Sequence, residues 1–314
     1  MATVAGPAHP GAAPVVAPPA GRVGRGGDGA PTQAAGRRSL TPYLLLAPGL
    51  AWLLLFFIVP MFTLAQTSLT EGSLNAGYEL TWRFANYVDV VRAYSPQFLR
   101  SFGYAALATL IALALGYPLA YFMAFRAGRY KPLVLVLVVM PLLVSFLVRT
   151  LAWKIILADN GPLVGTLKDI GLLAPNGRLL ATSTAVVAGL VYNFLPFMTL
   201  PLFVSLDKID PRLLEAANDL YARPSTAFWR VTWPLSLPGV IAGTLLVFIP
   251  AAGDFVNAEF LGTPSQYMIG NVIESRFLVV LDYPAAAALS FLLLLVILVL
   301  VIAYLRRAGT EEVL

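Results

Sequence analysis

The sequence contains no cysteine and a single histidine, His9, among its 314 residues. The missing cysteine excludes a disulfide framework, a thiolate nucleophile and a cysteine-ligated metal centre. Because His9 lies in a stretch rich in Gly, Ala and Pro, histidine acid–base chemistry and most transition-metal sites are excluded as well. We therefore expect no catalytic residue, no cofactor and no metal site in this chain.

Charged residues are also scarce. They make up 12% of the chain, against roughly a quarter in soluble domains. Hydrophobic residues make up 59%, and the mean hydropathy is +0.79. This composition excludes an ordinary cytosolic enzyme. The net charge is +5, and +3 of it falls within residues 1–40, so we expect no nucleic-acid partner.

Apart from residues 1–21, which are rich in Gly, Ala and Pro, six long stretches contain no Asp, Glu, Lys or Arg: 39–70, 101–125, 132–148, 179–206, 231–253 and 283–305. About 20 apolar residues are needed to cross a hydrocarbon core of roughly 30 Å. A single stretch of this kind could be a buried soluble helix, but six in one chain indicate an all-α integral membrane protein. The predicted transmembrane helices lie near residues 43–65, 101–125, 133–153, 180–205, 237–258 and 283–305.

The distribution of Lys and Arg predicts the orientation in the plasma (inner) membrane. With the N-terminus inside, the inner segments hold thirteen basic residues in 81, and the outer segments hold eight in 94. Both termini are then cytoplasmic.

Residues 1–40 lack the compact apolar core of a signal peptide, so we expect a disordered cytoplasmic tail there. Residues 41–307 form the membrane domain, and 308–314 form a short cytoplasmic tail.

The loop 207–236 carries the most local information. Asp210-Pro211 is typical of a helix N-cap followed by proline at the first helical position, so a short helix is predicted over 212–222. Arg223-Pro224-Ser225 predicts a turn with Ser225 as a new cap, and a second helix over 226–233 is expected to end at Pro234. These helices either lie on lipid as interfacial helices or dock onto a cytoplasmic partner.

The loop contains Glu215-Ala216-Ala217-Asn218-Asp219-Leu220, and Trp233-Pro234-Leu235-Ser236-Leu237-Pro238-Gly239 follows. With these residues the stretch resembles the signature of binding-protein-dependent ABC transporter permeases. In that family the loop forms a coupling helix that sits in a groove of the ATPase subunit. The likeness implies a type I ABC importer permease bundle of six transmembrane helices. Tyr221 stands where the signature has glycine, and a side chain cannot adopt glycine's dihedral angles at no cost; Val231 and Trp233 are further departures. The residues assigned to coupling are Glu215, Ala216, Ala217, Asp219, Tyr221, Pro234, Pro238 and Gly239.

Further motifs resemble the spermidine/putrescine permeases. They are Phe146–Trp153, Asp159–Leu163, Val191–Met198 and Gly253–Gly270. This resemblance implies ATPase subunits, a second permease subunit, an extracytoplasmic solute-binding protein and a polyamine as cargo, with membrane lipid around the helices. The chain contains no Gly-Lys dipeptide, so a P-loop of the form GxxxxGK[ST] is absent and a separate subunit must hydrolyse ATP.

A polyamine site needs carboxylates and aromatic faces away from bulk water. Candidates for the solute path are Asp254, Phe255, Glu259, Trp153, Tyr192 and Asn193. The two carboxylates could instead be solvated at the outer interface, and the aromatic residues could belong to an interfacial belt. Asp254 and Glu259 would lie about 140° apart on one helix, so we expect the helix to end near Phe255, with Asp254 at the cavity rim and Glu259 in the outer loop.

Arg149 and Lys154 argue against an outer entrance to the solute path that attracts only cations; they could contact the binding protein or pair with Asp159.

Three alternatives remain at this point. The same fold could carry another small solute, such as an amino-acid derivative, ferric ion or thiamine. The chain could be an ion-coupled secondary transporter, although internal inverted repeats are not evident. It could also be a membrane scaffold that transports nothing, although such a scaffold would not need prolines and carboxylates at membrane depth.

Overall fold

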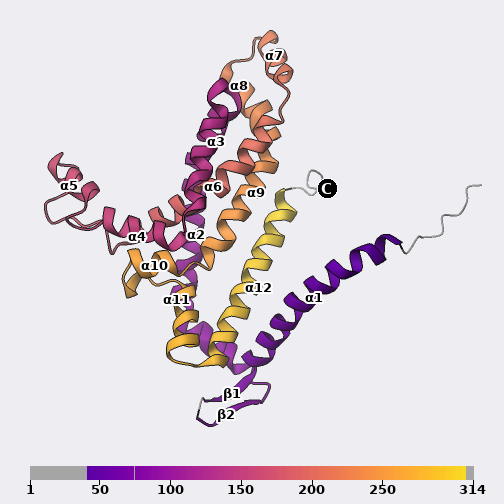
Figure 1. Ribbon diagram of the computed structural model, residues 1–314, viewed down its shortest axis with the longest axis vertical. Helices are drawn as coiled ribbons and strands as arrows, with labels where there is room; N and C mark the ends of the chain where they lie inside the picture. Colours follow the sequence, from indigo (N-terminus) through magenta and orange to yellow (C-terminus); the bar gives the residue numbers. More distant parts are fainter. Residues whose placement is uncertain (1–40, 74, 309–314) are drawn as a thin grey trace, which may run out of the picture. The chain divides into compact units, whose positions relative to one another are not determined.

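The computed structural model describes residues 41–73 and 75–308, and almost all of them are helical (Figure 1). The chain divides into two units, residues 1–53 and 54–314. The described part of the first unit is the beginning of α1 (Thr41–Ser68). The second unit contains the helical bundle. The predicted tail at 1–40 lies outside the described residues, as does the predicted tail at 308–314 apart from Ala308, the last residue of α12.

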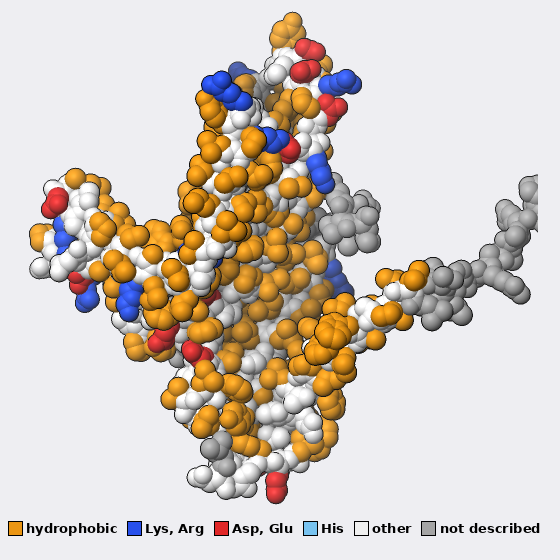
Figure 2. Space-filling model, viewed as in Figure 1, with side chains coloured by type: hydrophobic (Ala, Val, Ile, Leu, Met, Phe, Trp, Pro, Cys, Tyr) orange, Lys and Arg blue, Asp and Glu red, His pale blue; other side chains and the backbone are white. Residues whose placement is uncertain are grey.

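Among the residues that the structure describes, five helices are long and apolar enough to cross a membrane, and a sixth span is obtained if one bent pair is counted as a single span. The five are α1, α2 (Ala85–Phe125), α6 (Ser183–Asp207), the helix that ends with α9 (Trp233–Ala252), and α12 (Tyr283–Ala308). On the face shown in Figure 2 apolar side chains cover the helices, and charged side chains gather around α7. This pattern suits lipid along the helices and water at their ends.

The predicted third span, 133–153, is not one straight helix. The chain there forms η1 (Gly128–Tyr130), α3 (Lys131–Val139), η2 (Met140–Leu143) and then α4 (Phe146–Ile156), and the two halves are bent by 95°. Pro141 has no N–H to donate to the preceding turn, and Val144 and Ser145 have extended backbones with ψ of 138°. The apolar composition predicted a span, but these residues break it.

Two other predicted boundaries were wrong. The predicted span 237–258 ends early, because α9 stops at Ala252 and a separate helix, α10, begins at Val256. The predicted span 101–125 lies within the longer helix α2, which begins at Ala85. The second loop helix does not end at Pro234. α8 (Pro224–Ala227), the π-helical turn η3 (Phe228–Thr232) and α9 follow one another without a break, since Pro234 occupies the first turn of α9, a position that tolerates proline.

The core of the bundle is the packing of α2, α6 and α9, and small residues allow it. A Cβ atom added to Gly116 of α2 would lie 3.1 Å from Thr199 Oγ1, and one added to Gly239 of α9 would lie 2.6 Å from Ser205 Cβ, both on α6. Ala105, Ala108, Ala112 and Ala120 of α2 are fully buried. Small side chains let helix backbones approach closely where no hydrophobic effect drives their association.

Short elements occupy the two ends of the bundle. β1 (Thr70–Ser73) and β2 (Gly77–Leu80) form an antiparallel hairpin in which Thr70 pairs with Leu80. Figure 1 shows this hairpin at the opposite end from α7 (Pro211–Asp219). The other short elements are α5 (Pro162–Asp169), α10 (Val256–Leu261), η4 (Pro264–Gln266), α11 (Ile269–Glu274) and η5 (Ser275–Val279).

Candidate coupling loop and solute path

The predicted loop helix is present as α7. Asp210 Oδ1 accepts a hydrogen bond from Arg212 N at 2.9 Å, and Pro211 occupies the first turn, where its missing N–H is not needed. The next helix begins at Pro224, with Arg223 in an extended conformation at the N-cap, so Ser225 is not the cap. Local chemistry therefore sets both ends of the turn between the two helices.

Tyr221 has a φ of +55°, in the left-handed region that glycine adopts without strain. Its N–H donates to Asn218 O at 2.9 Å, and the side chain is 96% exposed. The residue at the signature's glycine position thus keeps a glycine-like backbone. A non-glycine residue in this region costs about 1–2 kcal/mol.

The outer face of α7 is free. Glu215, Ala216 and Asp219 are exposed and Ala217 is half-buried, while Leu220 next to them is 81% exposed. The other residues assigned to coupling lie apart from this face. Pro234 and Pro238 belong to the first turns of α9, and Gly239 is buried against α6. The structure therefore separates the exposed residues of α7 from the residues at the start of α9.

Two path candidates meet in one groove. The rings of Trp153 on α4 and Tyr192 on α6 are 5.3 Å apart and tilted by 66°. Together with Tyr104 of α2 they line a cavity of about 530 Å³, and Tyr104 donates a hydrogen bond to Ser183 Oγ at 2.6 Å. The lining, all of it in the described part of the chain, includes no Asp, Glu, Lys or Arg. This groove offers aromatic faces and apolar surface.

Asn193, the next residue along α6, belongs to a buried polar network instead. Its Nδ2 donates to Thr150 Oγ1 at 3.2 Å and to Asn257 Oδ1 at 3.1 Å. Asn257 in turn donates to Asp254 Oδ1, from its backbone N at 2.8 Å and from Nδ2 at 3.3 Å. Thr150 and Asn257 were not among the candidates; the signal for them was their position beside charged residues, since Thr150 follows Arg149 and Asn257 lies between Asp254 and Glu259.

Asp254 lies between α9, which ends at Ala252, and α10. The expected helix end near Phe255 is therefore present. However, Asp254 is only 7% exposed and not at an open rim; its carboxylate accepts hydrogen bonds from the backbone N–H and the side-chain amide of Asn257 in α10. Glu259 lies in α10 rather than in a loop, and it is exposed.

Arg149 is buried as well, with 8% of its surface exposed. Its Nη1 lies 3.4 Å from Asn193 O, and its guanidinium is 5.6 Å from the Phe146 ring centre. Within residues 41–73 and 75–308, Arg149 Nε and Asn193 Oδ1 have no hydrogen-bond partner. The suggested pairing of Arg149 with Asp159 was wrong, since Asp159 pairs with Arg178 at 3.1 Å. A buried cation and a buried carboxylate thus share one polar network.

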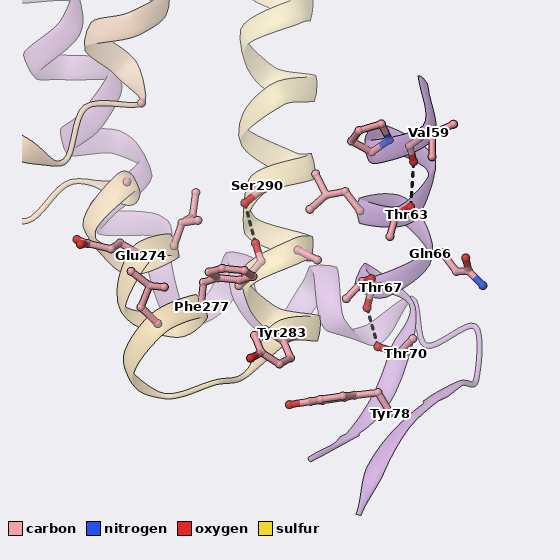
Figure 3. Close-up of a pocket in the computed structure, with 18 of the residues that line it drawn as sticks. Val59, Thr63, Gln66, Thr67, Thr70, Tyr78, Glu274, Phe277, Tyr283 and Ser290 are labelled. Atoms are coloured by element: carbon pink, nitrogen blue, oxygen red, sulfur yellow. Dashed lines mark hydrogen bonds between the residues drawn. The ribbon is translucent and has the colours of Figure 1, made fainter. Parts of the chain in front are cut away.

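The last two path candidates lie elsewhere. Glu259 Oε2 accepts from Asn271 Nδ2 at 3.4 Å, and its carboxylate, by hydrogen bonding to the phenol, raises the pKa of Tyr267. Phe255 lines a second cavity of about 1190 Å³ bordered by α1, the hairpin and α12. Figure 3 shows Phe277 directed toward α12 and the Glu274 carboxylate directed away from it. The structure does not bring the six path candidates into one site.

Comparison with known proteins identifies the chain's relatives. Residues 108–308 match the family described as binding-protein-dependent transport system inner membrane component. The chain is 40% identical over 258 residues to the spermidine/putrescine transport system permease protein PotB of Haemophilus influenzae, covering 82% of this chain and 90% of that protein. It is 37% identical to PotB of Escherichia coli over 81% of this chain and 93% of that protein.

A third relative is the inner membrane ABC transporter permease protein YdcU of Escherichia coli, 31% identical over 82% of each chain. Among solved structures, a bacterial ABC transporter that imports the acidic polysaccharide alginate superposes with a TM-score of 0.65, covering 88% of this chain and 97% of that one at 20% identity. That likeness establishes the fold. In such permeases ATP is hydrolysed by a partner subunit. This chain belongs to the binding-protein-dependent transport system inner membrane components, the permease subunits of ABC importers.

Proposed function

We propose that this permease imports polyamines of the spermidine and putrescine type. The observation that carries the proposal is the identity of 37–40% to two permeases named for these solutes, over more than 80% of the chain. The permease would work with a second permease subunit, two ATPase subunits and an external solute-binding protein. Both termini would lie in the cytoplasm, with α7 on the same side.

The free face of α7 would be the contact with the ATPase. Ala216 and Ala217 permit close approach of another surface, and Glu215 and Asp219 add charge at its edge. Tyr221 ends the helix with the sharp turn that directs the chain toward α8. Pro234, Pro238 and Gly239 would anchor the loop to the bundle, since Gly239 packs against α6.

The aromatic groove suits the solute's chemistry. Trp153 and Tyr192 present ring faces to an ammonium group, and apolar walls accept the methylene chain. Asn193 follows Tyr192 and belongs to the buried network that contains Asp254, and the Asp254 carboxylate would add negative charge at a distance. Phe255 and Glu259 would line the approach from outside.

One observation favours a second candidate cargo. Arg149 is buried beside Asn193, and an arginine at the path suits a solute with a carboxylate, such as an amino-acid derivative. An ion-coupled secondary transporter is not supported, because the family match is to binding-protein-dependent permeases.

Direct binding measurements on the cognate external binding protein test the cargo. We expect spermidine or putrescine to bind, and an amino-acid derivative, ferric ion and thiamine to show no binding at the same concentrations. In vesicles containing the whole transporter, the same polyamine should then stimulate ATP hydrolysis. Binding of the amino-acid derivative alone would replace the polyamine proposal with the second candidate.

A further inference from the structure

Four aromatic rings join the loop to α2 at the end of the bundle that carries α7. Tyr117 of α2 lies 5.7 Å from Phe228 of η3 and 5.3 Å from Trp233 of α9, measured between ring centres. Tyr121, one turn further along α2, lies 6.3 Å from Phe228. We call Tyr117, Tyr121, Phe228 and Trp233 the aromatic joint. Such edge-to-face and tilted ring pairs bury apolar surface and also favour particular orientations of the two rings.

A buried hydrogen-bond chain holds the joint in place. Ser236 Oγ donates its one hydrogen to Trp233 O at 2.9 Å. The Tyr117 hydroxyl lies 2.9 Å from Ser236 Oγ and is therefore the donor in the bond between these two hydroxyl groups. Tyr117 is 7% exposed and Ser236 is fully buried. The contact therefore ties α2 to the first turn of α9 by a directional bond as well as by packing.

Both segments that meet at the joint have a weakened helix. In α2, Pro118 follows Tyr117 directly and removes one backbone hydrogen bond. On the loop side, Phe228 lies in the π-helical turn η3, and single π turns are frequent at functional sites. A helix that contains a missing bond or an extra residue can bend there while the rest of it stays straight.

We infer that the aromatic joint carries the displacement of the coupling loop into α2, so that Tyr117 and Phe228 are positioning residues for transport. The inference rests on the proposed docking of α7 on an ATPase. Movement of α7 pulls on η3, and the rings pass this movement to α2. α2 also lines the aromatic groove through Tyr104 and Leu107. The joint thus links the loop to the groove through one helix.

The test uses the assembled transporter in lipid vesicles and a reporter that needs no knowledge of the cargo. The chain has no cysteine, so Leu107→Cys, 47% exposed on α2 in the groove, introduces a single thiol. We expect ATP with vanadate to change its labelling rate. Phe228→Ala or Tyr117→Ala should reduce this change at least about fivefold, as loss of a typical coupling energy does, while the ATPase still co-purifies and hydrolyses ATP.

Matched variants separate coupling from general packing. Tyr117→Phe keeps the ring and should retain the labelling change. Phe248→Ala removes a different ring pair between α2 and α9, that of Phe102 and Phe248 at 6.3 Å, and should also retain it. If Phe228→Ala does not accumulate, Phe228→Leu keeps the apolar volume and should show the same loss.

Two results would overturn the inference: an equal loss in Phe248→Ala, or an unchanged response in both Phe228 variants. Loss of the ATPase from the Phe228 variants would also overturn it, because the ring would then act in docking. The docking itself is tested separately by Glu215→Ala. If the ATPase co-purifies and couples normally with that variant, the proposed docking face is wrong, whatever the Phe228 variants show.

Discussion

At the scale of single residues, Tyr221 holds a backbone conformation that strains any residue other than glycine. Its φ is +55°, and its side chain, 96% exposed, has almost no packing to lose. Tyr221→Gly should therefore stabilise the loop by about 1 kcal/mol and leave uptake intact. Thermal inactivation of the purified transporter measures this. Tyr221→Val should do the opposite, since a β-branched residue fits the left-handed region worst.

The two carboxylates after α9 should differ in importance. Asp254 is buried and accepts the Asn257 N–H of α10, whereas Glu259 is exposed. Asp254→Asn keeps the size of the side chain and an oxygen acceptor but deletes the charge, so polyamine uptake should fall by about tenfold, the effect of roughly 1.4 kcal/mol. Glu259→Gln should have a smaller effect. Uptake at the wild-type rate in both variants, at matched expression, would assign these carboxylates to structure alone.

At the scale of elements, two glycines of α9, Gly239 and Gly243, pack against α6, and Gly239 lies closer to its backbone. A Cβ atom on Gly239 would lie 2.6 Å from Ser205 Cβ and 2.7 Å from Pro201 O. The backbone oxygen cannot move aside, so Gly239→Ala should destabilise the bundle by about 1–3 kcal/mol. Gly103→Ala is the matched control, because no atom lies within 4 Å of its added Cβ. Unfolding measured in detergent should show a lower stability for Gly239→Ala than for Gly103→Ala.

The α7 helix should be required for transport but not for folding. Its free face carries Glu215 and Ala216 with no packing inside the chain to disturb. Glu215→Ala or Ala216→Asp should abolish uptake while the protein stays in the membrane, because a carboxylate buried unpaired at an interface costs about 1–3 kcal/mol or more. Normal uptake with normal expression of both variants would exclude α7 as the ATPase contact.

At the scale of the whole molecule, the positive-inside rule predicts that α7 lies in the cytoplasm. Single cysteines at Ser73, Asn176 and Ser265, which are all exposed, should react with a membrane-impermeant thiol reagent in intact cells. Cysteines at Gly128 and Ser225, also exposed, should react only after the cells are opened. The reverse pattern would place α7 on the side where no ATPase can reach it.

The amino-acid sequence by itself determined the spans and the local turns. In lipid, the backbone N–H and C=O groups of each charge-free stretch must bond to one another within a helix, so the composition of the stretch is enough to predict that helix. The Asp210-Pro211 cap likewise depends on neighbouring residues alone. The family resemblance supplied the coupling loop and the class of transporter.

Only the tertiary structure decided which polar groups meet. Asn193 bonds to Asn257, 64 residues away, and this contact buries Asp254 away from the open rim that the spacing suggested. The 95° bend after η2 and the unbroken helix through Pro234 also depend on packing, because a proline removes one hydrogen bond but does not dictate the path of the chain. Spans follow from transfer free energies summed along the sequence, whereas sites follow from contacts between distant residues.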